Sequence, residues 1–338
     1  MSGLVLAALL AASADTLVVG LTADPVSLDP HRATDIVSAA VVANVCEPLV
    51  RYRPDGSRPE AALATSWATS DSRTWTFTLR PGVRFHDGTP LDAAAVVANL
   101  EDLRRQRSFP GRAARAGPLV VTVTLDQPNA ALLATLSQTF YAMQSPRAMG
   151  PGATGRLVGT GPFRLESARP GRIELTANAD YWGGPPRLRR IVFRRFADQP
   201  SLVTALSAGE VDVTSAVGQD TVGRLRGQAG ITLDSQTGLN TVFLCPNNDR
   251  RPFGDRRVRQ ALARAVDRRA LVRDVLGGHG VPARNPLPPT LWDRATRMKE
   301  LALDRAGARR LLAEAGYPDG FDTTLMTVDA ARPYLPSG

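Results

Sequence analysis

Side chains that could carry out catalysis are few and widely spaced in this sequence of 338 residues. The only lysine, Lys299, lies between Met298 and Glu300, so it does not belong to a phosphate-binding loop, in which lysine precedes serine or threonine. The segment GTGP at 159–162 begins like a dinucleotide-binding loop but continues with proline and lacks the third glycine. No Gly-x-Ser-x-Gly, His-Glu-x-x-His or Cys-x-x-Cys motif occurs. We therefore expect no catalytic residues, although a pair of distant carboxylates would leave no such spacing.

The residues that most often bind metals are also isolated. The three histidines, His31, His86 and His279, and the two cysteines, Cys46 and Cys245, show none of the short spacings of metal sites. We expect no metal and no cofactor, and we expect the histidines to lie in loops or at the surface. Export would permit a disulfide between the cysteines, but two distant cysteines do not establish one.

Residues 1–14 are predicted to be a secretory signal peptide. An apolar run from Leu4 to Ala12 is followed by the Ala-x-Ala pattern of residues 12–14 and then by Asp15. No basic residue precedes the run, so the true start codon could lie upstream. The run is too short to span a bilayer, and no later stretch approaches ~18 apolar residues. No cysteine follows the run at the position where a lipid anchor would be attached. The sequence predicts a periplasmic protein that is soluble after export.

The charge balance does not indicate nucleic-acid binding. Lys and Arg number 41 against 32 Asp and Glu, a formal charge of +9, and all but one of the basic residues are arginine. Arginine spread over helices and loops reflects overall composition, and no zinc-finger or aromatic RNA-binding motif accompanies it. With 43% hydrophobic residues the chain is that of a folded protein, and its length predicts two or three domains.

Strands and helices alternate irregularly, which predicts an α/β fold. Period-two or β-branched apolar patterns predict strands at 16–22, 74–79, 119–125, 173–176, 191–196 and 211–213. Helical spacing with capping aspartates or proline predicts helices at 37–45, 93–103, 200–206, 256–265 and 304–315. A further helix capped by Asp267 is predicted to bury Leu271, Val272, Val275 and Leu276.

Four blocks of sequence resemble one protein family. The first joins LTADPVSLDPH at 21–31 to CEPLVRY at 46–52, and the second is LATSWATSDSRTWTFTLRPGVRFHDGTPLDAAAVVANL at 63–100. The third contains GTGPF, NADYWGGPPRLRRIVFRRF and ALSAGEVDV between 159 and 213. The fourth joins residues 239–278 to ARRLLAEAGYPDGF at 308–321. In content and order these blocks resemble the family 5 extracellular solute-binding proteins of ABC importers.

This resemblance implies a periplasmic-binding-protein-like, two-lobed α/β fold of type II with an inserted subdomain. The first lobe would comprise 15–45 and 159–245, the inserted subdomain 46–158, and a partial second lobe 246–338. Relatives continue well past the position of Gly338, so we expect the second lobe to be incomplete. The GTGPF segment is expected to be a structural turn, and Trp67, Trp75 and Trp182 are expected to be core residues.

The resemblance also implies a function. The chain would bind oligopeptides or dipeptides between two lobes and deliver them to permease subunits, as a monomer without catalytic activity. A nickel chelate, glutathione or a sugar stays open as the ligand. A secreted hydrolase is the alternative from another class of protein. The loop of Thr34, Asp35 and Ile36 resembles the family's pocket-lining loop, and Asn240 lies where the chain crosses between lobes. Asp35 would either meet a cationic group or, the interpretation we favour, cap the helix that follows.

Overall fold

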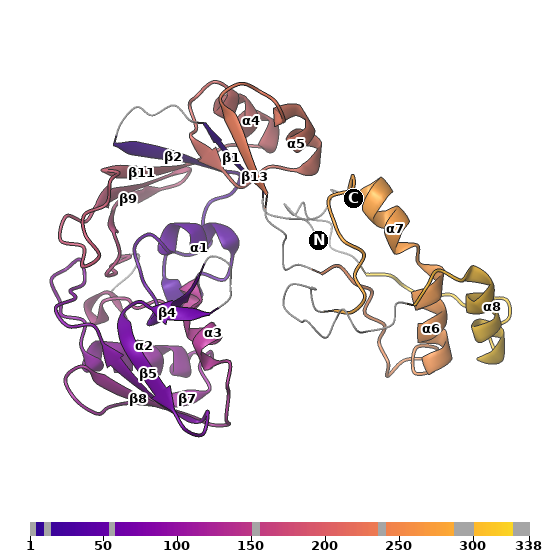
Figure 1. Ribbon diagram of the computed structural model, residues 1–338, viewed down its shortest axis with the longest axis horizontal. Helices are drawn as coiled ribbons and strands as arrows, with labels where there is room; N and C mark the ends of the chain where they lie inside the picture. Colours follow the sequence, from indigo (N-terminus) through magenta and orange to yellow (C-terminus); the bar gives the residue numbers. More distant parts are fainter. Residues whose placement is uncertain are drawn as a thin grey trace. The chain divides into compact units, whose positions relative to one another are not determined.

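The computed structural model describes residues 5–9, 15–53, 58–150, 156–235, 241–286 and 301–326 (Figure 1). The chain forms two compact units. Residues 11–213 make up the first, which we call the central unit, and residues 1–10 with 214–338 make up the second, the terminal unit.

A mixed sheet in the central unit positions the loop that the resemblance points to. Its strands lie in the order β2 (Thr16–Leu21), β11 (Arg190–Arg195), β10 (Arg172–Ala177) and β9 (Phe163–Arg169). β2 and β11 are parallel, and β10 is antiparallel to both of its neighbours. A helix follows each parallel strand: α1 (Ile36–Val42) comes after β2, and α4 (Gln199–Ser207) comes after β11. Aspartates cap both helices, because their carboxylates accept hydrogen bonds from the first-turn amides.

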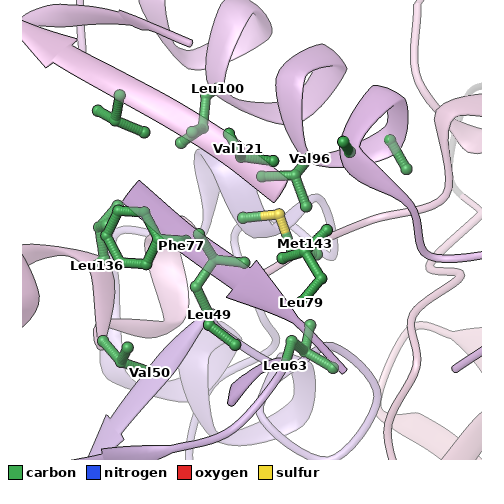
Figure 2. Close-up of a cluster of buried hydrophobic side chains, with 14 of the residues drawn as sticks. Leu49, Val50, Leu63, Phe77, Leu79, Val96, Leu100, Val121, Leu136 and Met143 are labelled. Carbon is green, nitrogen blue, oxygen red and sulfur yellow. The ribbon is translucent and has the colours of Figure 1, made fainter. Parts of the chain in front are cut away.

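An antiparallel sheet with its own core lies between β2 and β9 in the sequence. Its order is β5 (Ala64–Thr69), β6 (Thr74–Leu79), β8 (Val120–Leu125) and β7 (Gly111–Arg115). Helix α2 (Ala93–Arg105), capped by Asp92, packs against β7 and β8. Figure 2 shows this core, in which Phe77 and Leu79 of β6 meet Val96 and Leu100 of α2. The remaining elements of the central unit are short: η1 (Pro30–Arg32), β3 (Val50–Tyr52), β4 (Pro59–Ala61), α3 (Leu132–Leu136), η2 (Thr139–Tyr141) and η3 (Pro146–Ala148).

The described residues of the terminal unit include a strand pair and a helix pair. β1 (Val5–Leu9) pairs antiparallel with β13 (Ile231–Ser235), which contacts α5 (Gln219–Leu225). α6 (Arg256–Ala265) packs on α8 (Arg305–Glu314), and α7 (Arg268–Ala270) runs into the π-helix η4 (Leu271–Val275). β12 (Val213–Thr214) lies where the two units meet in the sequence. The backbone of Val5–Leu9 is thus a strand in a segment that the sequence predicts to be a signal peptide.

Most predicted elements are confirmed, with small shifts at their ends. The strand over 74–79 has the alternating burial that its sequence predicts, with Trp75, Phe77 and Leu79 buried. One packing prediction is wrong, because Leu271 is 48% exposed and Val275 is 50% exposed instead of buried. Val272 and Leu276, the other two residues of the predicted apolar face, are partly buried. None of the helices in the described part of the chain combines the length and hydropathy that a membrane span requires.

Candidate functional site

The loop after β2 lies where an α/β sheet usually presents its binding site. β2 ends at Leu21, and the carbonyl of Leu21 accepts a hydrogen bond from the amide of Phe196, the residue after the parallel strand β11. The loops that follow β2 and β11 therefore leave the same edge of the sheet. In open α/β sheets, ligands bind outside the carboxyl ends of the strands, which makes the loop over 22–36 the candidate binding loop.

Two of the predicted site residues in this loop are exposed, and the third is engaged within the protein. Thr34 and Ile36 are exposed, whereas Asp35 is half-buried and caps α1. One carboxylate oxygen of Asp35 accepts hydrogen bonds from the amides of Val37 (3.0 Å) and Ser38 (2.8 Å), and the other accepts one from the Ser38 hydroxyl. Burial acts to raise the pKa of Asp35, but these hydrogen bonds outweigh it and lower the pKa. In the structure, Asp35 therefore caps α1, as in the interpretation that we favour from the sequence.

Polar contacts fix the rest of the loop. Asp24 accepts a hydrogen bond from the amide of Gly171 (2.9 Å), and the amide of Ser27 donates to the hydroxyl oxygen of Ser38 (3.1 Å). His31 is 2% exposed, and its Nδ1 donates to the carboxylate of Asp102 on α2 at 3.2 Å. His31 lies in a loop, as one alternative of the prediction has it, but it is buried there and does not lie at the surface. The loop joins both sheets of the central unit, since one end is held by the mixed sheet and the other by α2.

The fourth predicted site residue, Asn240, lies outside the described residues, so the structure places only three of the four.

The GTGPF segment is a structural junction, as its sequence predicts. A Cβ atom on Gly159 would lie 1.9 Å from the carbonyl oxygen of Val45, and one on Gly161 would lie 2.8 Å from the same oxygen. The amide of Gly161 donates to that oxygen at 2.9 Å. Both glycines are required because two backbone segments touch at this point.

A buried carboxylate joins three segments beside this junction. Glu47 accepts hydrogen bonds from Thr160 Oγ1, Tyr181 Oη and Trp182 Nε1, each at 2.8 Å. Burial raises the pKa of Glu47, and the three donors oppose that shift. The guanidinium carbon of Arg80 lies 4.2 Å from the ring centroid of Trp182. All of these atoms have partners inside the protein, so the cluster is a structural connection and offers no group to a ligand.

His86 completes the junction. Its backbone amide donates to the carbonyl of Gly159 (2.8 Å), and its Nε2 donates to the carbonyl of Gly161 (2.9 Å). Its Nδ1 is buried and has no hydrogen-bond partner. Burial lowers the pKa of His86 to about 4, because a second ring proton would find no acceptor. The neutral ring is thus part of the fold.

Of the three tryptophans predicted to be core residues, Trp75 is buried, and the other two are partly buried against the core. Trp75 is 5% exposed, and Trp67 and Trp182 are partly buried against the core of the antiparallel sheet.

The described residues contain no cluster that could bind a metal, and their two cysteines are unpaired. Among these residues, no group of three or more His, Cys, Asp or Glu side chains could hold a metal ion. Cys46 is buried and Cys245 is exposed, and both are free thiols. Burial raises the pKa of the Cys46 thiol, so it is unreactive.

Comparison with known proteins identifies the family. Residues 58–336 match the family described as "Bacterial extracellular solute-binding proteins, family 5 Middle". The chain belongs to this family. The match includes the whole antiparallel sheet, the GTGPF junction and most of the terminal unit. It contains the second, third and fourth sequence blocks and confirms the family that they resemble.

Curated relatives of this family 5 protein include glutathione-binding proteins. The chain is 33% identical over 335 residues to the glutathione-binding protein GsiB of Salmonella paratyphi A, covering 95% of this chain and 65% of the relative. The chain therefore spans about two thirds of the length of the curated relatives that it matches.

Solved structures share the fold of this family 5 chain. The periplasmic binding protein DppA from Helicobacter pylori, in complex with the peptide STSA, has a TM-score of 0.77 at 28% identity, covering 90% of this chain and 67% of that one. NikA from Brucella suis, in complex with Fe(III)-EDTA, has a TM-score of 0.78 at 29% identity, covering 89% and 64%. The predicted α/β fold of a periplasmic binding protein is confirmed.

Sequence reasoning missed the Glu47 cluster and the contact between His31 and Asp102. Glu47 lies in the CEPLVRY block, but its partners follow more than 100 residues later, so no local spacing reveals them. The position of Glu47 among apolar residues at 45–50 is the one local feature that could have indicated a buried carboxylate.

Proposed function

We propose that this chain is the ligand-binding component of an ABC importer and that its ligands are oligopeptides or dipeptides. The observation that carries the proposal is the family match over 58–336. The structural likeness to proteins solved with the peptide STSA and with the dipeptide Met-Leu supports peptides as the ligand class. The protein binds and releases its ligand and performs no covalent chemistry. Binding is a shift between conformations that the ligand's contacts stabilise differently.

The loop over 22–36 is proposed as the part of the site contributed by the first lobe. Thr34 and Ile36 are exposed at the carboxyl edge of β2, where they can contact a ligand. Asn240 is proposed as a further contact. The lobes are proposed as residues 15–45 with 159–245, and 246–338, with 46–158 as the inserted subdomain.

Export and delivery complete the proposal. We propose that residues 1–14 direct the chain to the periplasm and are removed there, and that the mature protein is a monomer that hands its ligand to permease subunits. The Ala-x-Ala pattern before Asp15 supports the cleavage. The intact mass of the protein recovered from the periplasm tests it, because a mass that includes residues 1–14 would refute cleavage.

Isothermal titration of the ligand-stripped protein tests the ligand class. Stripping uses unfolding in urea, dialysis and refolding, and the panel comprises dipeptides, a tetrapeptide, glutathione and a nickel chelate. Saturable heat with the peptides is expected. Heat with the nickel chelate alone would overturn the peptide assignment.

Glutathione is the second candidate ligand. The observation in its favour is the 33% identity to glutathione-binding proteins over 95% of the chain. Glutathione is itself a small peptide. If it binds more tightly than every dipeptide in the same titration, glutathione replaces dipeptides as the proposed ligand. Turnover of a peptide or ester library would instead revive the secreted hydrolase.

A further inference from the structure

The strand pair of the terminal unit joins two segments that lie far apart in the sequence. β1 pairs antiparallel with β13 over five residues, from Val5 opposite Ser235 to Leu9 opposite Ile231 (Figure 1). Among the strands of the described ranges, β13 has no neighbour other than β1. Residues 5–9 are therefore the strand that completes the backbone pairing of β13.

Signal cleavage removes this neighbour. The proposed cleavage after Ala14 separates β1 from Asp15 and from the rest of the chain, and the present inference rests on that step of the proposed function. Once β1 has left, the edge of β13 presents backbone N–H and C=O groups that have lost their partners. An open strand edge of this kind is a template for pairing with another extended segment, because the backbone groups still require hydrogen bonds.

β13 also has support that does not involve β1. Helix α5 contacts β13, and Val222 and Leu225 of α5 are buried. The turn between α5 and β13 contains Gly227 and Gly230 at positive φ values of 82° and 81°, a conformation that glycine adopts without strain. The helix and the turn hold β13 from its own side, so its edge keeps a defined position for an incoming strand.

The burial of β13 alternates along the strand and specifies what its partner must be. Ile231 and Leu233 are partly buried, whereas Thr232 and Asp234 are exposed. Residues directly opposite each other in an antiparallel pair have their side chains on the same face of the sheet. A strand in the place of β1 therefore needs apolar residues opposite Ile231 and Leu233. It can carry polar residues opposite Thr232 and Asp234, and the charge of Asp234 favours a basic one.

We propose that the edge of β13 is a strand-acceptor site, which receives an extended segment of another polypeptide after signal cleavage has removed residues 5–9. The incoming segment runs antiparallel to β13, contains no proline and alternates apolar with polar residues. In such strand addition the main-chain hydrogen bonds supply affinity, and the alternate side chains supply specificity. The site shares no residue with the proposed ligand site.

Titration of a synthetic peptide against the processed chain tests the site. The peptide has the sequence of residues 3–12 followed by a short lysine tail for solubility, and the protein is residues 15–338. Saturable binding is expected, and hydrogen exchange should slow at the amides of residues 231–235. The unprocessed chain 1–338 is the matched control and should not bind the peptide, since β1 already occupies the edge.

Variants of the peptide test the pairing without altering the protein. Leu9→Lys places a charge opposite the partly buried Ile231 and should weaken binding about tenfold or more. Leu6→Lys makes the same change opposite the exposed Asp234 and should bind at least as tightly as the unmodified peptide, because opposite charges then face each other. Equal weakening by the two variants would refute the register on which the site depends.

The remaining outcomes separate this site from the proposed function. Absence of binding, or exchange protection confined to residues other than 231–235, refutes the site. Displacement of the peptide by excess dipeptide would assign the binding to the ligand site and refute it as well. A dimer of the processed chain that the peptide dissociates would make a second copy the occupant and overturn the outside partner. Recovery of a periplasmic chain that retains residues 1–14 would overturn cleavage and leave β13 covered, whereas failure of every dipeptide to bind would overturn only the ligand class.

Discussion

Replacing Gly159 by alanine should destabilise the central unit more than other glycine substitutions. The added Cβ atom would lie 1.9 Å from the carbonyl oxygen of Val45, 2.6 Å from the carbonyl carbon of Val45 and 2.7 Å from the Cα of Cys46. All three are backbone atoms, so no side-chain rotation relieves the overlap. The two segments have to move apart.

The cost can be worked from what this separation breaks. The amide of His86 donates to the carbonyl of Gly159, and the amide of Gly161 donates to the carbonyl of Val45. Losing these two buried hydrogen bonds costs about 1–2 kcal/mol each, and the residual overpacking adds about 1–2 kcal/mol. We expect the free energy of unfolding to fall by about 4 kcal/mol.

Urea unfolding followed by tryptophan fluorescence measures this change, because Trp67, Trp75 and Trp182 all lie in the central unit. With a slope of about 2–3 kcal/mol per molar urea, the midpoint should drop by about 1.3–2 M. Gly117→Ala is the matched control, since its Cβ would be 3.6 Å from the nearest atom, an ordinary contact, and its midpoint should not move. Equal midpoints for the two variants would refute the close approach at the junction.

Three further predictions concern the buried charges and the exposed apolar surface. Glu47→Ala should lower the free energy of unfolding by about 3 kcal/mol because the buried N–H of Trp182 loses its acceptor, whereas Glu47→Gln should cost about 1 kcal/mol; equal losses in urea unfolding would contradict this. The pKa of His86 is depressed from 6.5 to about 4, so between these pH values the unfolded chain binds a proton that the folded chain does not. The free energy of unfolding therefore falls as the pH drops from 6.5 towards 4, by up to about 3 kcal/mol. His86→Gln should flatten this dependence between pH 7 and 4.5, and an unchanged dependence would count against the depressed pKa. Replacing Leu271 and Val275 by serine should reduce the binding of a hydrophobic dye and change stability by less than about 0.5 kcal/mol, since both side chains are about half exposed; a large loss in thermal unfolding would show that they are packed.

Much of the local structure could be predicted from the sequence. The alternation of Trp75, Phe77 and Leu79 with threonines predicted both a strand and its buried face. Asp35, Asp92 and Asp255 marked helix starts to within a residue. These predictions succeed because periodicity and capping depend on neighbours within one or two turns of the chain. The four blocks similarly sufficed for the family.

The tertiary structure decided what those side chains do. Spacing left Asp35 as either a ligand contact or a cap, and only the positions of its neighbours showed that its carboxylate serves α1. The helical apolar pattern at Leu271 and Val275 predicted burial, yet burial requires a second surface, and in the structure both side chains stay about half exposed. Glu47 acquires its three donors from residues more than 100 positions away. A sequence records which faces of an element are apolar, but contacts between distant segments depend on how those faces pack, and that is settled only when the chain folds.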